Sequence, residues 1–252
     1  MSAREPEGHE QAASLVRIWR RIVPSRTIPR TRWRSEGSRW RTGPLTFVVL
    51  VLGLWLFGTG EAMLVDAGLG NAPWTVFAQG VEVRTGIPIG VATFLTSVVV
   101  LLLWIPLRER PGLGTIANAI VIATALQVML WVLPTPAALI WQVVQVAVAI
   151  LLVGVGSGLY LTTNLGPGPR DGLMTSIHER TGIAVTPIRL GIEVVVLGIG
   201  WILGGTVGVG TLAFALLIGP SVGYGLRFVG WVAGAKADVP LTEDDPHPEL
   251  EA

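Results

Sequence analysis

The sequence predicts an all-α membrane protein with about six transmembrane helices, arranged as two inverted three-helix repeats that each add a short re-entrant or interfacial helix. Composition points to the membrane, because 51% of the 252 residues are hydrophobic and only 14% are charged, against roughly 25% charged residues in soluble domains. Six long apolar segments give the number of helices, and an internal repeat gives their arrangement.

Charge and hydropathy divide the chain into four regions. Residues 1–42 form a basic arm that holds ten of the eighteen Lys and Arg residues, and residues 235–252 form an acidic tail. Residues 43–134 and 135–234 are the first and second membrane repeats. The arm and the tail are polar and broken by prolines, so we expect both to be disordered.

The basic arm is a stronger indication of how the protein is oriented in the membrane than of a binding site. Its arginines favour retention on the cytoplasmic side of the membrane, and residues 13–23 also suit a short amphipathic helix against anionic lipid headgroups. An organelle transit peptide and an RNA-binding arm are alternative interpretations of an Arg-rich N-terminus. The apolar sequence that follows favours the topological role, and no nucleic-acid partner is expected.

Each long apolar segment has about the 20 residues needed to cross the hydrocarbon of a bilayer. The segments are 45–65, 87–107, 115–133, 138–161, 187–203 and 211–232. Helix-like stretches at 73–85 and 169–181 lie between the first and second and between the fourth and fifth segments. Each is only about 20 Å long as a helix and is too short to cross.

Basic residues near the segment ends predict the orientation, since cytoplasmic loops are enriched in Lys and Arg. An N-terminus inside and six crossings leave both termini in the cytoplasm, together with Arg108, Arg110, Arg170, Arg180, Arg227 and Lys236. The outer loops at 134–136 and 204–207 carry no charge, and only Arg84 departs from the pattern. We therefore expect a multi-pass protein of the bacterial cytoplasmic (inner) membrane, surrounded by lipid.

The internal repeat appears when the chain is shifted by about 96 residues, which aligns 58–122 with 154–218 without a gap at roughly twenty identities. The most specific match sets Leu69-Gly70-Asn-Ala-Pro73 on Leu165-Gly166-Pro-Gly-Pro169. Here a glycine allows a sharp turn and a proline suits the first position of a helix. Because each unit contains three crossings, the second copy enters from the opposite membrane face.

Paired short helices at equivalent positions of inverted halves point to the binding site of a transporter, and two helix N-termini suit an anion or a zwitterion. The alternative is that both turns simply lead into interfacial helices. The candidate substrate-binding residues are Glu61, Gly70, Pro73, Gly166, Pro169, Arg170, Asp171, Arg189 and Glu193.

Charged residues within the membrane region are costly and usually face the interior with a partner. Glu61 is the best candidate for a titratable carboxylate. Arg189 and Glu193 stand four apart and can pair on one helix face, as a site or as a structural ion pair with Arg189 reaching the interface; their repeat counterparts Thr93 and Ser97 are neutral. Asp171 follows Arg170 in the first turn of a short helix, where ordinary capping is the alternative explanation.

Several function classes find no support in the sequence. There is no cysteine, and three scattered histidines do not form a metal site. No nucleotide-binding loop or hydrolase motif is present. We therefore expect no enzyme activity, no cofactor and no metal, and any transport would be passive, gradient-coupled or driven by a separate partner.

The run Thr163-Asn-Leu-Gly-Pro-Gly-Pro-Arg-Asp-Gly-Leu-Met174, with Arg180-Thr-Gly and Gly208-Val-Gly-Thr211 after it, resembles the YczE/YitT-type family of bacterial polytopic membrane proteins. The resemblance implies a bacterial inner-membrane protein of about six spans and leaves the function open. Our leading hypothesis is a transporter or permease for a small polar or anionic solute. The alternative is a non-transporting membrane scaffold or accessory subunit of a partner complex, and both are compatible with oligomerisation.

Overall fold

The computed structural model describes residues 27–234 and 239–240. Within these residues the chain forms eight α-helices and two short strands. The helices are α2 (Pro44–Ala67), α3 (Pro73–Thr85), α4 (Ile89–Leu107), α5 (Leu113–Val132), α6 (Leu139–Leu161), α7 (Pro169–Thr181), α8 (Val185–Ile202) and α9 (Val209–Val232). Strands β1 (Thr27–Ile28) and β2 (Val239–Pro240) pair antiparallel. The predicted amphipathic helix at 13–23 and nearly all of the acidic tail lie outside the described residues.

Six of these helices are long and apolar enough to span a membrane, namely α2, α4, α5, α6, α8 and α9. The prediction of an all-α membrane protein with six crossings is confirmed. The short helices α3 and α7 begin and end at the predicted residues. A proline occupies the first position of each, and each is followed by a glycine in the left-handed region, Gly86 at φ 74° and Gly182 at φ 69°.

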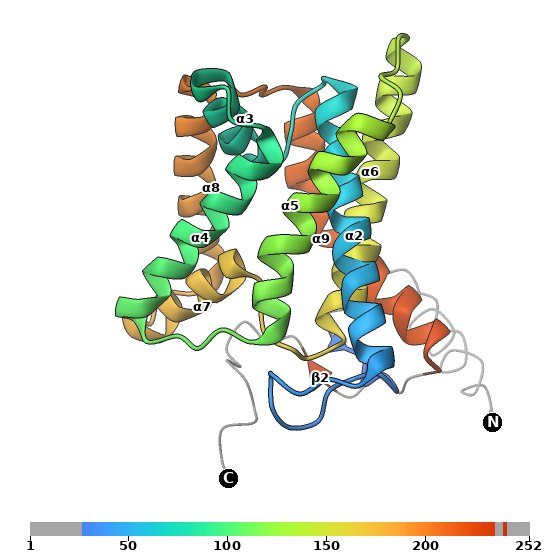
Figure 1. The fold of residues 1–252 in the computed structure, drawn as a ribbon, viewed down its shortest axis with the longest axis vertical. Helices are drawn as coiled ribbons and strands as arrows, with labels where there is room; N and C mark the ends of the chain where they lie inside the picture. Colours follow the sequence, from blue (N-terminus) through green and yellow to red (C-terminus); the bar gives the residue numbers. More distant parts are fainter. Residues whose placement is uncertain (1–26, 235–238, 241–252) are drawn as a thin grey trace, which may run out of the picture.

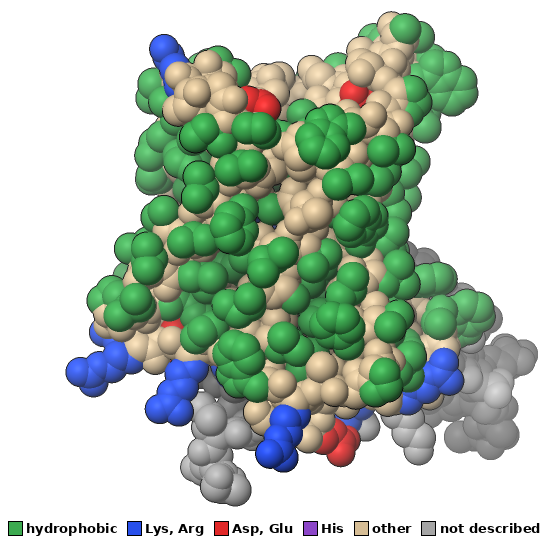
Figure 2. All heavy atoms as spheres, in the orientation of Figure 1, with side chains coloured by type: hydrophobic (Ala, Val, Ile, Leu, Met, Phe, Trp, Pro, Cys, Tyr) green, Lys and Arg blue, Asp and Glu red, His purple; other side chains and the backbone are tan. Residues whose placement is uncertain are grey.

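The long helices run between two ends of the molecule, and the short helices lie toward opposite ends (Figure 1). Helix α3 lies near the end that carries the α5–α6 loop, and α7 lies near the other end, beside the chain segment that precedes α2 (Figure 1). Hydrophobic side chains cover the flank between the ends, and Lys and Arg gather mainly at the end near α7 (Figure 2). This distribution of side chains suits a lipid bilayer around the flank.

Glycines bring the central helices α2 and α6 into backbone contact. A Cβ added to Gly156 would lie 2.6 Å from the carbonyl oxygen of Gly53, and one added to Gly53 would lie 2.9 Å from that of Gly156. Small residues permit such close helix packing in a membrane, where no hydrophobic force drives helices together. Helix α5 packs on α2 and α9 packs on α6, so these four helices form the centre of the bundle.

The outer helices are not packed alike. Helix α4 packs against α5 as well as against α3 and α7, whereas α8 packs against α3 and α7 and has at most slight contact with α9. Helix α8 accordingly buries only Ile188 and Gly200. The bundle is therefore looser on the side where α8 faces α9.

Residues 28–43 lie against the loops at one end of the bundle, which differs from the prediction of a disordered arm for this part of the chain. Trp33 is 5% exposed, and its indole Nε1 donates a hydrogen bond of 3.0 Å to Oγ1 of Thr162. The carbonyl oxygen of Arg39 accepts a bond of 2.9 Å from the backbone N–H of Leu113. Burial of an indole with its N–H satisfied holds this segment, because the apolar ring leaves water without losing a hydrogen bond.

Arg84, the residue that departs from the predicted charge pattern, caps another helix. Its Nε donates to the carbonyl oxygen of Leu203 at 3.2 Å, and its Nη2 donates to that of Ile202 at 3.3 Å. These carbonyls belong to the end of α8, where free C=O groups attract a cation. The side chain of Arg84 therefore joins α3 to α8.

Candidate functional site

A cavity of about 280 Å³ lies inside the bundle, and each of the eight described helices contributes to its wall. The first turn of α3 lines it through Pro73, Trp74 and Thr75, and the first turn of α7 lines it through Arg170 and Asp171. Pro73, Trp74 and Thr75 are buried. The first turns of the two short helices therefore border the same cavity, and the free N–H groups of a helix N-terminus favour negative charge nearby.

Six of the nine candidate residues line this cavity. They are Glu61, Pro73, Arg170, Asp171, Arg189 and Glu193. These residues come from α2, α3, α7 and α8, so helices distant in the sequence bring them together.

The other three, Gly70, Gly166 and Pro169, do not line the cavity and instead hold its walls in place. Gly70 and Gly166 turn the chain at φ 111° and φ 109°, where a side chain would be strained. A Cβ on Gly166 would lie 2.9 Å from Oγ1 of Thr115 at the start of α5. The prediction that these glycines bind substrate finds no support in the geometry, because the start of another helix occupies the space beside each of them.

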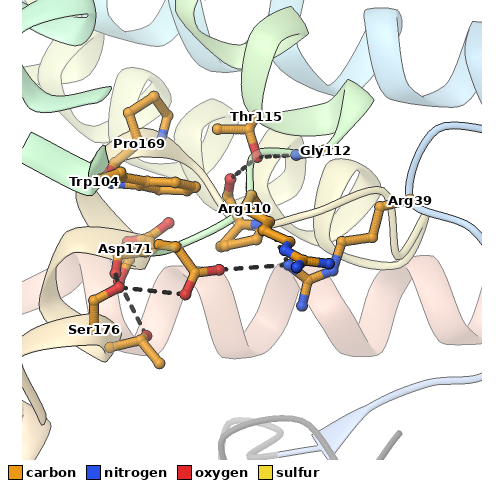
Figure 3. Close-up of polar contacts among 12 residues, drawn as sticks. Arg39, Trp104, Arg110, Gly112, Thr115, Pro169, Asp171 and Ser176 are labelled. Atoms are coloured by element: carbon orange, nitrogen blue, oxygen red, sulfur yellow. Dashed lines mark hydrogen bonds and ion pairs between the residues drawn. The ribbon is translucent and has the colours of Figure 1, made fainter. Parts of the chain in front are cut away.

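Pro169 accepts a hydrogen bond instead of facing the cavity. Its carbonyl oxygen takes a bond of 3.0 Å from Nε1 of Trp104, which is 1% exposed. In the same region Thr115 donates to the carbonyl oxygen of Pro167 at 2.8 Å, and Ser176 donates to Oε2 of Glu109 at 3.4 Å. These polar contacts join α7 and the turn before it to α4, to α5 and to the α4–α5 loop (Figure 3).

Two carboxylates of the wall each accept a hydrogen bond from a hydroxyl group. Glu61 is 3% exposed and accepts a hydrogen bond on Oε2 from Oγ1 of Thr75. Asp171 accepts a bond of 2.9 Å on Oδ2 from the phenol of Tyr160. The hydrogen bond from Tyr160 gives Asp171 a partner on α6 in addition to its favourable position at the N-terminus of α7, so simple capping does not fully account for it.

Arg170 lies against the ring of Trp74, with its Cζ 4.8 Å from the ring centroid. This cation–π contact joins the first turns of α3 and α7. Burial lowers the pKa of the Arg170 guanidinium from its ordinary value, and the carboxylates of Glu61, Asp171 and Glu193 oppose that effect, Glu61 most strongly. The positive charge of Arg170 is therefore stabilised by three carboxylates.

Arg189 and Glu193 form the predicted ion pair, with Nε 2.9 Å from Oε1. Their side chains are 51% and 25% exposed, and Asp171 is also exposed. These residues lie on α7 and α8. The cavity is consequently more accessible on this side than on the side of α2 and α3, where Glu61, Trp74 and Thr75 are buried.

Sequence reasoning missed several polar and aromatic residues of the wall, namely Trp74, Thr75, Asn118, Ser157 and Tyr160. Their signal was the rare polar side chain inside an apolar segment, as at Asn118 and Ser157. Thr93 and Ser97, considered only as neutral counterparts of Arg189 and Glu193, also line the cavity.

Many wall residues stand about 96 residues apart in the sequence. The pairs include Glu61 with Ser157, Trp74 with Arg170, Thr75 with Asp171, Thr93 with Arg189, and Ser97 with Glu193. In each of these pairs one member is charged and the other is neutral. The cavity therefore lies between equivalent positions of the two aligned segments, and its charges are unevenly divided between them.

Comparison with known proteins agrees with the membrane fold. The chain is 42% identical over 204 residues to an uncharacterized protein of Haemophilus influenzae, covering 81% of this chain and 93% of the relative. It is 29% identical over 182 residues to the uncharacterized membrane protein YczE of Bacillus subtilis, covering 72% and 82% of the two chains. It is also 24% identical over 172 residues to the uncharacterized protein YyaS of Bacillus subtilis, covering 67% and 86%.

No solved structure matches the chain. The resemblance to the YczE/YitT-type family is confirmed by the similarity to YczE. The six apolar helices and this relative identify an integral, multi-pass membrane protein. Because the model of the family of unknown function DUF6198 matches residues 45–227, which include every residue of the cavity wall, the chain belongs to that family.

Proposed function

We propose that the protein is a transporter or permease for a small polar solute, with its binding site in the cavity between two inverted repeats. The observation that carries the proposal is that the first turns of two short helices and five charged residues, one of them the buried Glu61, line one cavity. Two broken or short helices that begin at the centre of a membrane bundle are typical of transporter sites. A volume of about 280 Å³ limits the ligand to a small molecule.

The inverted-repeat arrangement is part of this proposal and has support in the geometry. Helices α3 and α7 lie toward opposite ends of the molecule (Figure 1), and the cavity wall is built largely from residues about 96 positions apart. An inverted pair of similar units has two states of nearly equal energy, one open to each membrane face, which alternating access requires.

The proposal includes the bacterial inner membrane, with both termini in the cytoplasm. It rests on the gathering of Lys and Arg at the end near α7 (Figure 2), where anionic lipid headgroups attract basic residues. It assigns no chemical step to the cavity, whose wall contains no histidine or cysteine.

Uptake by purified protein in liposomes tests the proposal. Labelled amino acids, small carboxylates, amines and inorganic phosphate are offered separately, and at least one should enter faster than into protein-free liposomes. Glu61→Gln and Arg189→Ala should lower that uptake by about tenfold or more, since each removes a charge of the cavity wall. Glu179→Gln, a change at an exposed carboxylate of α7 outside the wall, should leave it unchanged.

Absence of uptake for the whole panel by folded protein contradicts transport and favours the scaffold or accessory subunit. Equal uptake by the wild type and by both cavity variants would place the route elsewhere in the protein.

A further inference from the structure

We infer that the cavity binds a small zwitterionic group, with its anionic part at Arg170 and its cationic part at Glu61. This inference rests on the proposed function and names the class of ligand. It follows from charges that face each other without pairing, from a buried hydroxyl group without a partner, and from the balance of charge in the wall.

Arg170 and Glu61 attract each other without forming an ion pair. Glu61 is the carboxylate that acts most strongly on Arg170, yet no nitrogen of Arg170 lies within 4.0 Å of an oxygen of Glu61. Opposite charges in a membrane interior normally close into contact, because separation without water is unfavourable. A gap between them is suited to a ligand that carries both charges.

The guanidinium of Arg170 keeps its hydrogen-bonding edge free. One face lies on the ring of Trp74, and its nitrogens donate no hydrogen bond to any residue within 27–234. A planar guanidinium stacked on an aromatic ring is held in orientation while its N–H groups remain available to a carboxylate or phosphate.

One buried hydroxyl group in the wall also lacks a partner in the described part of the chain. Thr93 is 5% exposed, and its Oγ1 has no hydrogen bond. Buried polar groups are nearly always satisfied, so this hydroxyl is suited to a ligand that enters the cavity.

The balance of charge excludes the simpler ligands. The wall carries three carboxylates, Glu61, Asp171 and Glu193, and two guanidiniums, Arg170 and Arg189. A simple anion would add to the excess of negative charge, and a simple cation would leave the free edge of Arg170 without an acceptor. A zwitterion places its anionic group at Arg170 and its cationic group at Glu61, and it adds no net charge to the cavity.

The same chemistry has two sources, a free amino-acid-like solute and the headgroup of phosphatidylethanolamine. Both carry an anionic group and an ammonium a few bonds apart. The wall residues Asp171 and Arg189 are exposed, so a lipid headgroup could reach them as well as a solute. The experiment therefore tests the two sources separately.

Thermal unfolding of the full chain in detergent, with ligand added, tests the inference. The zwitterions are glycine, L-valine, β-alanine, taurine and glycine betaine, with valinamide and 2-hydroxyisovalerate as partners of valine that each lack one charge. A lipid arm compares short-chain phosphatidylethanolamine with short-chain phosphatidylglycerol. At least one zwitterion should raise the unfolding temperature, while its single-charge analogues at equal concentration should not.

Variants then assign the two ends of the ligand. Arg170→Gln and Glu61→Gln should each weaken the apparent affinity for the zwitterion by about tenfold or more. If Arg170→Gln fails to fold, Arg170→Lys replaces it, because lysine keeps the positive charge but lacks the planar guanidinium. Arg180→Gln and Glu179→Gln, at the exposed end of α7, are the matched controls and should bind like the wild type.

Equal stabilisation by an anion or a cation alone overturns the inference, as does the absence of stabilisation by every zwitterion and by phosphatidylethanolamine. Uptake of a solute of another class into liposomes would then leave the proposed function standing. Failure of all uptake together with clear zwitterion binding would contradict transport alone.

Discussion

Gly156 and Gly53 are required where α2 crosses α6, because each faces the backbone of the other helix. Gly158 is likewise close to Gly225 of α9, with 2.7 Å from an added Cβ to the carbonyl carbon. Their contact partners depend on which helices cross, so only the structure identifies them.

Gly156→Ala should destabilise the protein by about 1–3 kcal/mol, because the new methyl group would overlap the backbone of Gly53 and Phe57. Unfolding in detergent, followed by temperature or denaturant, measures the change. Gly198→Ala is the matched control, since nothing lies within 4 Å of a Cβ there, and it should be neutral or stabilising by up to about 1 kcal/mol. Equal effects of the two substitutions would contradict close α2–α6 packing.

The short elements at the ends of the bundle depend on two kinds of interaction, with adjacent residues and with residues distant in the sequence. The bounds of α3 and α7 follow from a proline at the start and a glycine at the end, which act on the adjacent backbone. The position of residues 28–43 follows from Trp33 and its bond to Thr162. The partner of that bond lies 129 positions away, so the segment looked like a disordered arm in the sequence.

Trp33→Ala should release residues 28–43 from the bundle, because it removes both a buried ring and the bond to Thr162. Limited digestion with trypsin should then cut at Arg32 and Arg34 several times faster than in the wild type. Trp40→Ala is the control, since Trp40 is 56% exposed, and its digestion should match the wild type. Unchanged cleavage in Trp33→Ala would mean that other contacts hold the segment.

The arrangement of the whole molecule depends on how many times the chain crosses the membrane. Six spanning helices bring the start of α2 and the end of α9 to the same end (Figure 1), and the α5–α6 loop lies at the opposite end. The uneven distribution of Lys and Arg between the ends (Figure 2) predicts which end faces the cytoplasm. Inversion of the second repeat depends on this count, since an even number of crossings in each unit would leave the two copies parallel.

Single cysteines test the topology directly, because the chain has no native cysteine. Ala137→Cys lies in the α5–α6 loop and Glu36→Cys lies in the segment before α2, and both positions are exposed. A membrane-impermeant maleimide added to intact cells should label Ala137→Cys alone, and Glu36→Cys should react only after the membrane is opened. Labelling of both positions in intact cells would contradict the antiparallel arrangement and the site between the repeats.

The sequence by itself determined the membrane class, the six crossings and the bounds of the short helices, because segment length, hydropathy, proline and glycine act locally along the chain. Of the nine residues that it proposed for the site, six line the cavity, because charges are rare between the first and last membrane segments and a proline marks the start of each short helix. Only the tertiary structure decided that Arg170 stacks on Trp74 and that Tyr160 holds Asp171. It also decided that Gly70 and Gly166 pack against other helices. These contacts join residues from different helices, and the packing of the whole bundle determines which side chains meet.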